Sequence, residues 1–96
     1  MTTIELLRHR REDVLKLAQG HGVQSVRVFG SVARGEDSPG SDIDLLVTVG
    51  PRTSSWFPAG LVVDLEKLLG RRVDIVTEPG LNPLLRDQVL MEAVPL

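Results

Sequence analysis

Residues 42–49 have the sequence Asp-Ile-Asp-Leu-Leu-Val-Thr-Val, an apolar segment rich in residues that favour β-strands. A strand that is apolar at consecutive positions is typical of the middle of a sheet that is covered on both faces. The 96-residue chain has room for one such core, so we expect a single domain over residues 1–96. Aromatic residues make up only 3% of the chain, so this core must consist mainly of Leu, Val and Ile.

Expected strands and helices alternate along the rest of the chain. Alternating β-branched residues predict two further strands, at about 24–29 and 71–77. Helices are predicted from a capping box at Thr2 and Glu5 to a glycine-rich end at 19–22, briefly after Gly30, over the apolar positions of 61–69 up to Gly70, and over 82–93. This order favours an α/β (α+β) fold, with a small mixed sheet of about three strands covered by helices.

Two details of these elements are specific enough to be tested. Asn82 is predicted to be the N-cap of the last helix, with Pro83 in its first turn and Leu84, Leu85, Val89 and Leu90 on its core face. The longest irregular segment is 50–58. Its Trp56 and Phe57 either contact a nucleotide or partner or pack against the following helix.

Composition excludes several classes of site. The chain has no cysteine, which rules out disulfides, thiolate zinc sites and a cysteine nucleophile. A net charge of −2 argues against direct nucleic-acid binding, and we interpret the basic run at 8–11 as a solvated or partner-facing helix surface. The charged N-terminus does not resemble a signal peptide, and no apolar run approaches the roughly 18 residues of a membrane span. We therefore expect a soluble cytoplasmic protein without membrane contact.

Asp42 and Asp44 are the strongest candidates for a metal site. Side chains two residues apart in a strand point to the same face, about 6.6 Å apart along the chain. Mg²⁺ takes hard oxygen ligands, few of them from protein and the others from water and phosphates. The alternative is that Asp42 caps the turn and Asp44 is a strand-edge charge. A calcium loop is excluded, since the glycine precedes the acid pair and an apolar strand follows it.

Two neighbouring features strengthen this interpretation. Gly30 and Ser31 lie where a strand turns into a helix, and Arg34 follows one turn later, so backbone N–H groups, a hydroxyl and a guanidinium can meet one anion. Asp74 lies mid-strand between Val73 and Ile75, and its strand can bring a third carboxylate to the site. The alternatives are a plain Gly-Ser turn with a solvated Arg34, and a surface-facing Asp74 on an edge strand.

Gly30-Ser31, ten intervening residues and then Asp42-Ile43-Asp44 resemble the signature of the DNA polymerase β-like nucleotidyltransferase superfamily. Nearly the whole chain is similar to the minimal nucleotidyltransferase (MNT) family. The resemblance implies that Asp42 and Asp44 bind Mg²⁺ and that Asp74 is the third active-site carboxylate. It also implies that Gly30 and Ser31 hold the triphosphate of ATP, with Arg34 and Ser41 as further motif residues. The implied reaction transfers a nucleoside monophosphate to a hydroxyl and releases pyrophosphate.

Members of this size commonly act as antitoxins of HEPN-domain ribonuclease toxins, and some adenylylate a toxin tyrosine. This chain has no tyrosine, so we expect the acceptor on a partner, the cognate HEPN toxin in a hetero-oligomer. Two alternatives stay open. One is a binding antitoxin that masks its toxin without catalysis, and the other is a nucleotidyltransferase that modifies a small molecule.

Overall fold

A four-stranded mixed sheet forms the centre of the computed structural model, which describes residues 1–96. Its strands lie in the spatial order β3-β2-β1-β4. β2 is antiparallel to β1 and parallel to β3, while β4 is antiparallel to β1. Their bounds are β1 Val23–Phe29, β2 Ile43–Val49, β3 Val73–Thr77 and β4 Val94–Pro95.

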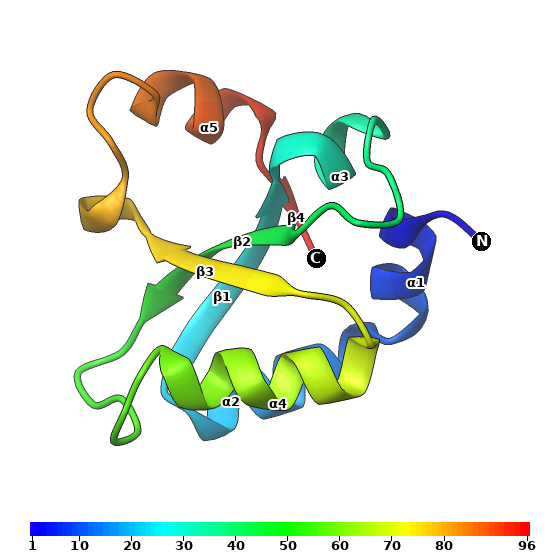
Figure 1. Cartoon of the computed structure of the whole chain (residues 1–96). Coiled ribbons are helices and arrows are strands. Elements are labelled where there is room, and N and C mark those ends of the chain that lie inside the picture. Colours follow the sequence, from blue (N-terminus) through cyan, green and yellow to red (C-terminus); the bar gives the residue numbers. More distant parts are fainter.

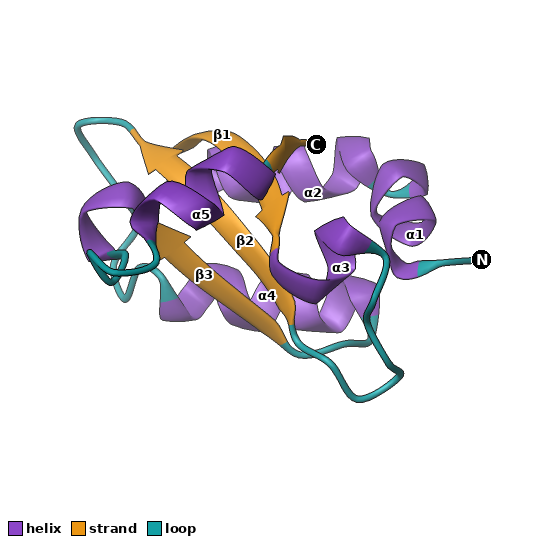
Figure 2. Ribbon diagram, turned by 90° about the horizontal axis from the view of Figure 1, so that it is seen from above, coloured by secondary structure: helices purple, strands orange, loops and turns teal.

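Helices cover both faces of this sheet. α2 and α4 lie side by side against one face, whereas α5 lies over the opposite face and α3 lies at the end of β1 (Figures 1 and 2). The helices are α1 Thr3–His9, α2 Arg11–Gly20, α3 Gly30–Arg34, α4 Ala59–Leu69 and α5 Arg86–Glu92, with a 3₁₀ turn, η1, at Glu78–Gly80. The predicted class, a small mixed sheet covered by helices, is confirmed. None of the helices has the length and hydropathy needed to cross a membrane.

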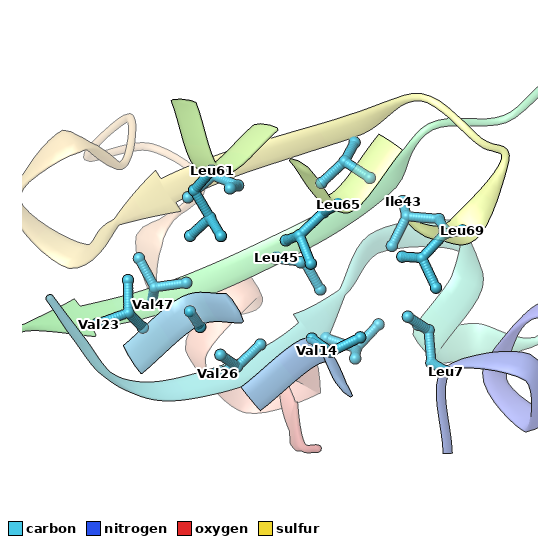
Figure 3. Packing of buried hydrophobic residues seen from close by; sticks show 14 of the residues in the cluster. Leu7, Val14, Val23, Val26, Ile43, Leu45, Val47, Leu61, Leu65 and Leu69 are labelled. Atoms are coloured by element: carbon cyan, nitrogen blue, oxygen red, sulfur yellow. The ribbon is translucent and has the colours of Figure 1, made fainter. Parts of the chain in front are cut away.

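The core lies between the sheet and α2 and α4. Ile43, Leu45 and Val47 alternate along β2 and are fully buried on this side, against leucines of α4 (Figure 3). Leu46 points to the other face and is also fully buried, which explains why the segment is apolar at consecutive positions. Burial of each such side chain stabilises the fold by about 1.5–3 kcal/mol. The predicted central position of this strand is therefore confirmed.

The N-terminal helix begins as predicted but ends earlier. Thr2 is the N-cap as predicted, since its side chain accepts a hydrogen bond from the Glu5 N–H at 3.2 Å; the Glu5 carboxylate accepts from the Thr2 hydroxyl at 3.0 Å and not from the backbone N–H of a full capping box. The expectation of one helix to about residue 19 is wrong, because the helix breaks at Arg10 and α2 starts at Arg11. The Thr3 hydroxyl bonds to Asp37 and Arg71, and these contacts hold α1 against the loop before β2.

The C-terminal region differs most from the prediction. α5 begins at Arg86, and the Asn82 side chain accepts a hydrogen bond from the Leu84 N–H at 3.0 Å, so it caps a turn instead of the helix. Leu84 is 91% exposed and Leu85 is also exposed, so neither belongs to the core; Val89 is buried as predicted. The chain then forms β4, which raises the strand count from about three to four.

Candidate functional site

The turn from β1 into α3 lies directly against a carboxylate of β2. Gly30 has φ +74°, a left-handed conformation that favours glycine. A Cβ at this position would lie 2.3 Å from Asp44 Oδ2, so a side chain has no room there. Phe29, the last residue of β1, is the register partner of Asp44, which explains this close approach. The predicted juxtaposition of the Gly-Ser turn and the aspartate segment is thus present in the fold.

The third predicted carboxylate lies next to Asp44. β2 and β3 are parallel neighbours, and their register pairs Asp44 with Asp74. Residues paired across neighbouring strands point to the same face, here the face opposite the α2–α4 layer. β3 is an edge strand and Asp74 is exposed, as the alternative of a surface-facing Asp74 on an edge strand predicted. Its predicted position beside Asp44 is nevertheless correct.

Asp42 lies just before β2 and contacts another side chain of the protein. Its carboxylate forms an ion pair with Arg72, with Arg72 Nε 3.1 Å from Asp42 Oδ1. Both side chains are largely exposed, so this pair contributes little to stability. Sequence analysis did not identify Arg72 as part of the site, although it directly precedes the strand of Asp74.

Negative charge is concentrated around Asp44. Its pKa is raised above the ordinary value, first by burial and then by the charges of Asp74 and Asp42. A divalent cation would relieve this repulsion, so the donor set fits Mg²⁺, which needs few protein ligands. As the side chains are placed, no three acidic or histidine groups form a ready-made metal cluster. Asp42 and Asp44 would hold the metal together with water and phosphate oxygens.

Arg34 and the Gly30 backbone share one acidic partner, Glu92 of α5. The Gly30 N–H donates to Glu92 Oε1 at 2.9 Å, and Arg34 Nη1 donates to Glu92 Oε2 at 3.0 Å. Arg34 Nε also donates to Glu36 Oε2 at 3.0 Å. Glu36 and then Glu92 raise the pKa of Arg34, which stays a full positive charge. Sequence reasoning missed Glu92, because only the fold brings it to a glycine 62 residues away.

The two serines of the motif have different surroundings. Ser31 follows Gly30 within α3 and is partly buried next to the turn. The Ser41 hydroxyl accepts a hydrogen bond from the Ser38 N–H at 3.0 Å, and the Ser41 carbonyl accepts one from Arg71. Ser41 therefore shapes the loop before β2 in this structure.

Segment 50–58 and His21 lie away from Asp42 and Asp44, because the segment follows the opposite end of β2. Trp56 is 87% exposed with φ +66°, whereas Phe57 packs against the core, so only Phe57 follows the packing alternative. His21 is the C-cap of α2, within the helix end predicted at 19–22, and its ring forms hydrogen bonds with Ser54 at 2.6 Å and Asp64 at 2.7 Å. The largest cavity, about 660 Å³, lies beside His21 between α2 and α4, on the face opposite Asp44.

Comparison with known proteins agrees with this geometry. Residues 7–96 match the family model of the nucleotidyltransferase domain. The Thermococcus cleftensis protein named protein adenylyltransferase MntA is 38% identical over 93% of this chain and 86% of its own length.

Solved structures of similar proteins also include a nucleotidyltransferase. A protein described as a minimal nucleotidyltransferase is 56% identical, with a TM-score of 0.84 over 100% of this chain and 97% of its own. A chain from an MntA-containing toxin–antitoxin complex is 25% identical, with a TM-score of 0.71 over 90% of this chain and 70% of its own. The carboxylates and the glycine turn lie within the region that all these comparisons cover.

Proposed function

Because this chain belongs to the nucleotidyltransferase domain family, we propose that it is a Mg²⁺-dependent protein adenylyltransferase that acts as an antitoxin. It transfers AMP from ATP to a hydroxyl, a tyrosine in our proposal, of a cognate HEPN-type toxin. The observation that carries the proposal is the pairing of Asp44 with Asp74 against the Gly30 turn. The protein adenylyltransferase MntA and the toxin–antitoxin complex support the acceptor class.

Each residue of the site has a role in this reaction. Asp42 and Asp44 would hold Mg²⁺, which would neutralise phosphate charge and help to orient the in-line displacement. The Gly30 N–H, the Ser31 hydroxyl and Arg34 hold the triphosphate, while Ser41 supports the loop that carries Asp42.

The proposed transfer of AMP involves the following bond changes. The acceptor oxygen attacks the α-phosphorus, the bond from that phosphorus to the bridging oxygen breaks, and pyrophosphate leaves with the electron pair. Asp74 accepts the hydroxyl proton, because its exposed carboxylate lies beside Asp44 at the open edge of the sheet.

A second candidate is a binding antitoxin that masks the toxin without catalysis. Two observations favour it. Arg72 already forms an ion pair with Asp42, and two apolar side chains are exposed to solvent, Leu84 just before α5 and Met91 on it. Three carboxylates brought together at the cost of mutual repulsion argue for the enzyme instead.

The first prediction separates the two candidates. The chain is incubated with its toxin, ATP and Mg²⁺, and the toxin is measured by intact-mass spectrometry. We expect the toxin to gain one or more AMP groups, and we expect the double variant Asp42→Ala, Asp44→Ala to add none. If both proteins neutralise the toxin without changing its mass, masking is the mechanism. If the double variant modifies the toxin as fast as the parent does, the assignment of the site is wrong.

A further inference from the structure

The Glu92 carboxylate is bound by the same hydrogen-bond donors that, in the proposed function, bind the triphosphate. It accepts hydrogen bonds from the Gly30 N–H at 2.9 Å and from Arg34 Nη1 at 3.0 and 3.2 Å. The Glu92 side chain is 18% exposed and its contact with the Gly30 N–H is partly buried, whereas the Arg34 side chain is 42% exposed. A carboxylate and a phosphate present similar charged oxygens to such donors, and the same donors cannot serve both at once.

The position of Glu92 is unfavourable for the carboxylates around it. Its charge adds to the effects of burial and of Asp74 and Asp42 that raise the pKa of Asp44. If Glu92 served only to anchor α5, a neutral side chain would anchor it without repelling these carboxylates. The charge is favourable only toward Arg34 and the Gly30 N–H, the two groups that a phosphate would require.

α5 is attached to the body of the protein by few buried groups. Val89 is its buried residue, while Met91 is 87% exposed. Beyond α5, Val94 and Pro95 pair with Val28 and Arg27 of β1, which fixes the chain just after Glu92. The Glu92 side chain can therefore leave its donors without loss of the sheet.

We propose that Glu92 is a built-in competitor of the nucleotide, which holds the Gly30 N–H and Arg34 until the triphosphate displaces it. The inference rests on the proposed function, since it assigns the same donors to phosphate. It makes Glu92 a residue that sets the affinity for nucleotide. Affinity must therefore rise when its charge is removed.

The second prediction tests this by isothermal titration of the whole chain with AMP-PNP and Mg²⁺, without acceptor. We expect Glu92→Gln to bind about tenfold more tightly than the parent, because the charge-assisted contact no longer has to be broken. Glu36→Gln is the matched control. It removes the same charge from the same guanidinium but leaves the Gly30 N–H untouched, and we expect its affinity to stay within about twofold of the parent.

Further measurements make the result decisive. Magnesium tripolyphosphate should show the same gain as AMP-PNP, whereas adenosine should show none. Glu92→Asp keeps the charge but shortens the reach, and it should also bind AMP-PNP more tightly; thermal unfolding shows that each variant is folded. Equal or weaker binding by both Glu92 variants, or an equal gain in Glu36→Gln, would overturn the inference and leave the proposed function standing. Absence of nucleotide binding by the parent and all variants would overturn both.

Discussion

At the scale of single residues, Gly30 and Asp44 lie so close together that each limits what the other position can hold. The left-handed conformation of Gly30 sets the direction of the chain from β1 into α3, and its missing Cβ leaves the space that Asp44 Oδ2 occupies. Gly35 ends α3 with a similar φ of +71°, but no atom lies within 4 Å of a Cβ built there. The two glycines therefore share the backbone requirement, but only Gly30 lies against the Asp44 carboxylate.

This pair gives the third prediction. Gly35→Ala should lose about 1–2 kcal/mol of unfolding free energy, because alanine is strained at positive φ, and Gly30→Ala should lose at least as much, because its Cβ also meets Asp44 Oδ2. Only Gly30→Ala displaces the Asp44 carboxylate, and it should reduce the rate of AMP transfer by a further factor of about 100. Urea unfolding and the mass assay measure the two effects. Equal rates in both variants would contradict the role given to the Gly30–Asp44 contact.

Elements with strong local patterns were predictable from sequence. In α4, the apolar positions recur at helical spacing, and Leu61, Leu65 and Leu69 are all buried. β2 was predictable because consecutive apolar residues indicate a strand covered on both faces. Elements determined by distant contacts were not predictable. β4 has two residues, one of them proline, and exists only because it pairs with Val28 and Arg27.

The same reasoning applies to the candidate site. The Gly30-Ser31 and Asp42-Asp44 motif lies within one short segment, so its spacing is visible in the sequence. Which residue lies opposite Asp74 depends on the order and register of the strands, and the local sequence pattern does not give either. Glu92 gives no local signal, since a glutamate near the end of a helix is ordinary.

The fourth prediction concerns α4 as an element. Leu65 is 1% exposed in the core cluster, so Leu65→Ala should cost about 2–5 kcal/mol of unfolding free energy through lost burial and a cavity. Val63 lies on the same helix but is 48% exposed, and Val63→Ala should change stability by less than about 0.5 kcal/mol. Urea unfolding compares the two. A similar loss in both variants would mean that the α2–α4 layer is not the main core.

At the scale of the whole molecule, folding brings together negative charges that are far apart in the sequence. Asp44 on β2, Asp74 on β3 and Glu92 on α5 approach one another only in the folded chain. Their repulsion is absent in the unfolded chain, where each carboxylate is surrounded by water. The fold is therefore least favoured, as far as this cluster is concerned, when all of its members are ionised.

The fifth prediction follows from the sign of this effect. The folded chain binds the Asp44 proton more tightly than the unfolded chain, because burial and the neighbouring charges raise the pKa of Asp44. The free-energy cost is therefore fully present above the folded pKa, and it disappears as the pH falls toward the unfolded value of about 3.9. In metal-free buffer, Asp44→Asn should be more stable than the parent at neutral pH, and the difference should shrink to nothing below about pH 4.

Urea unfolding of the two proteins across this pH range measures the difference. Asp87→Asn is the matched control, because it removes one exposed aspartate charge of α5. We expect its difference from the parent to stay small and nearly constant with pH. If Asp44→Asn is no more stable than the parent at neutral pH, the charges of the cluster do not destabilise the fold. The case for a cation that relieves their repulsion would then lose its electrostatic basis.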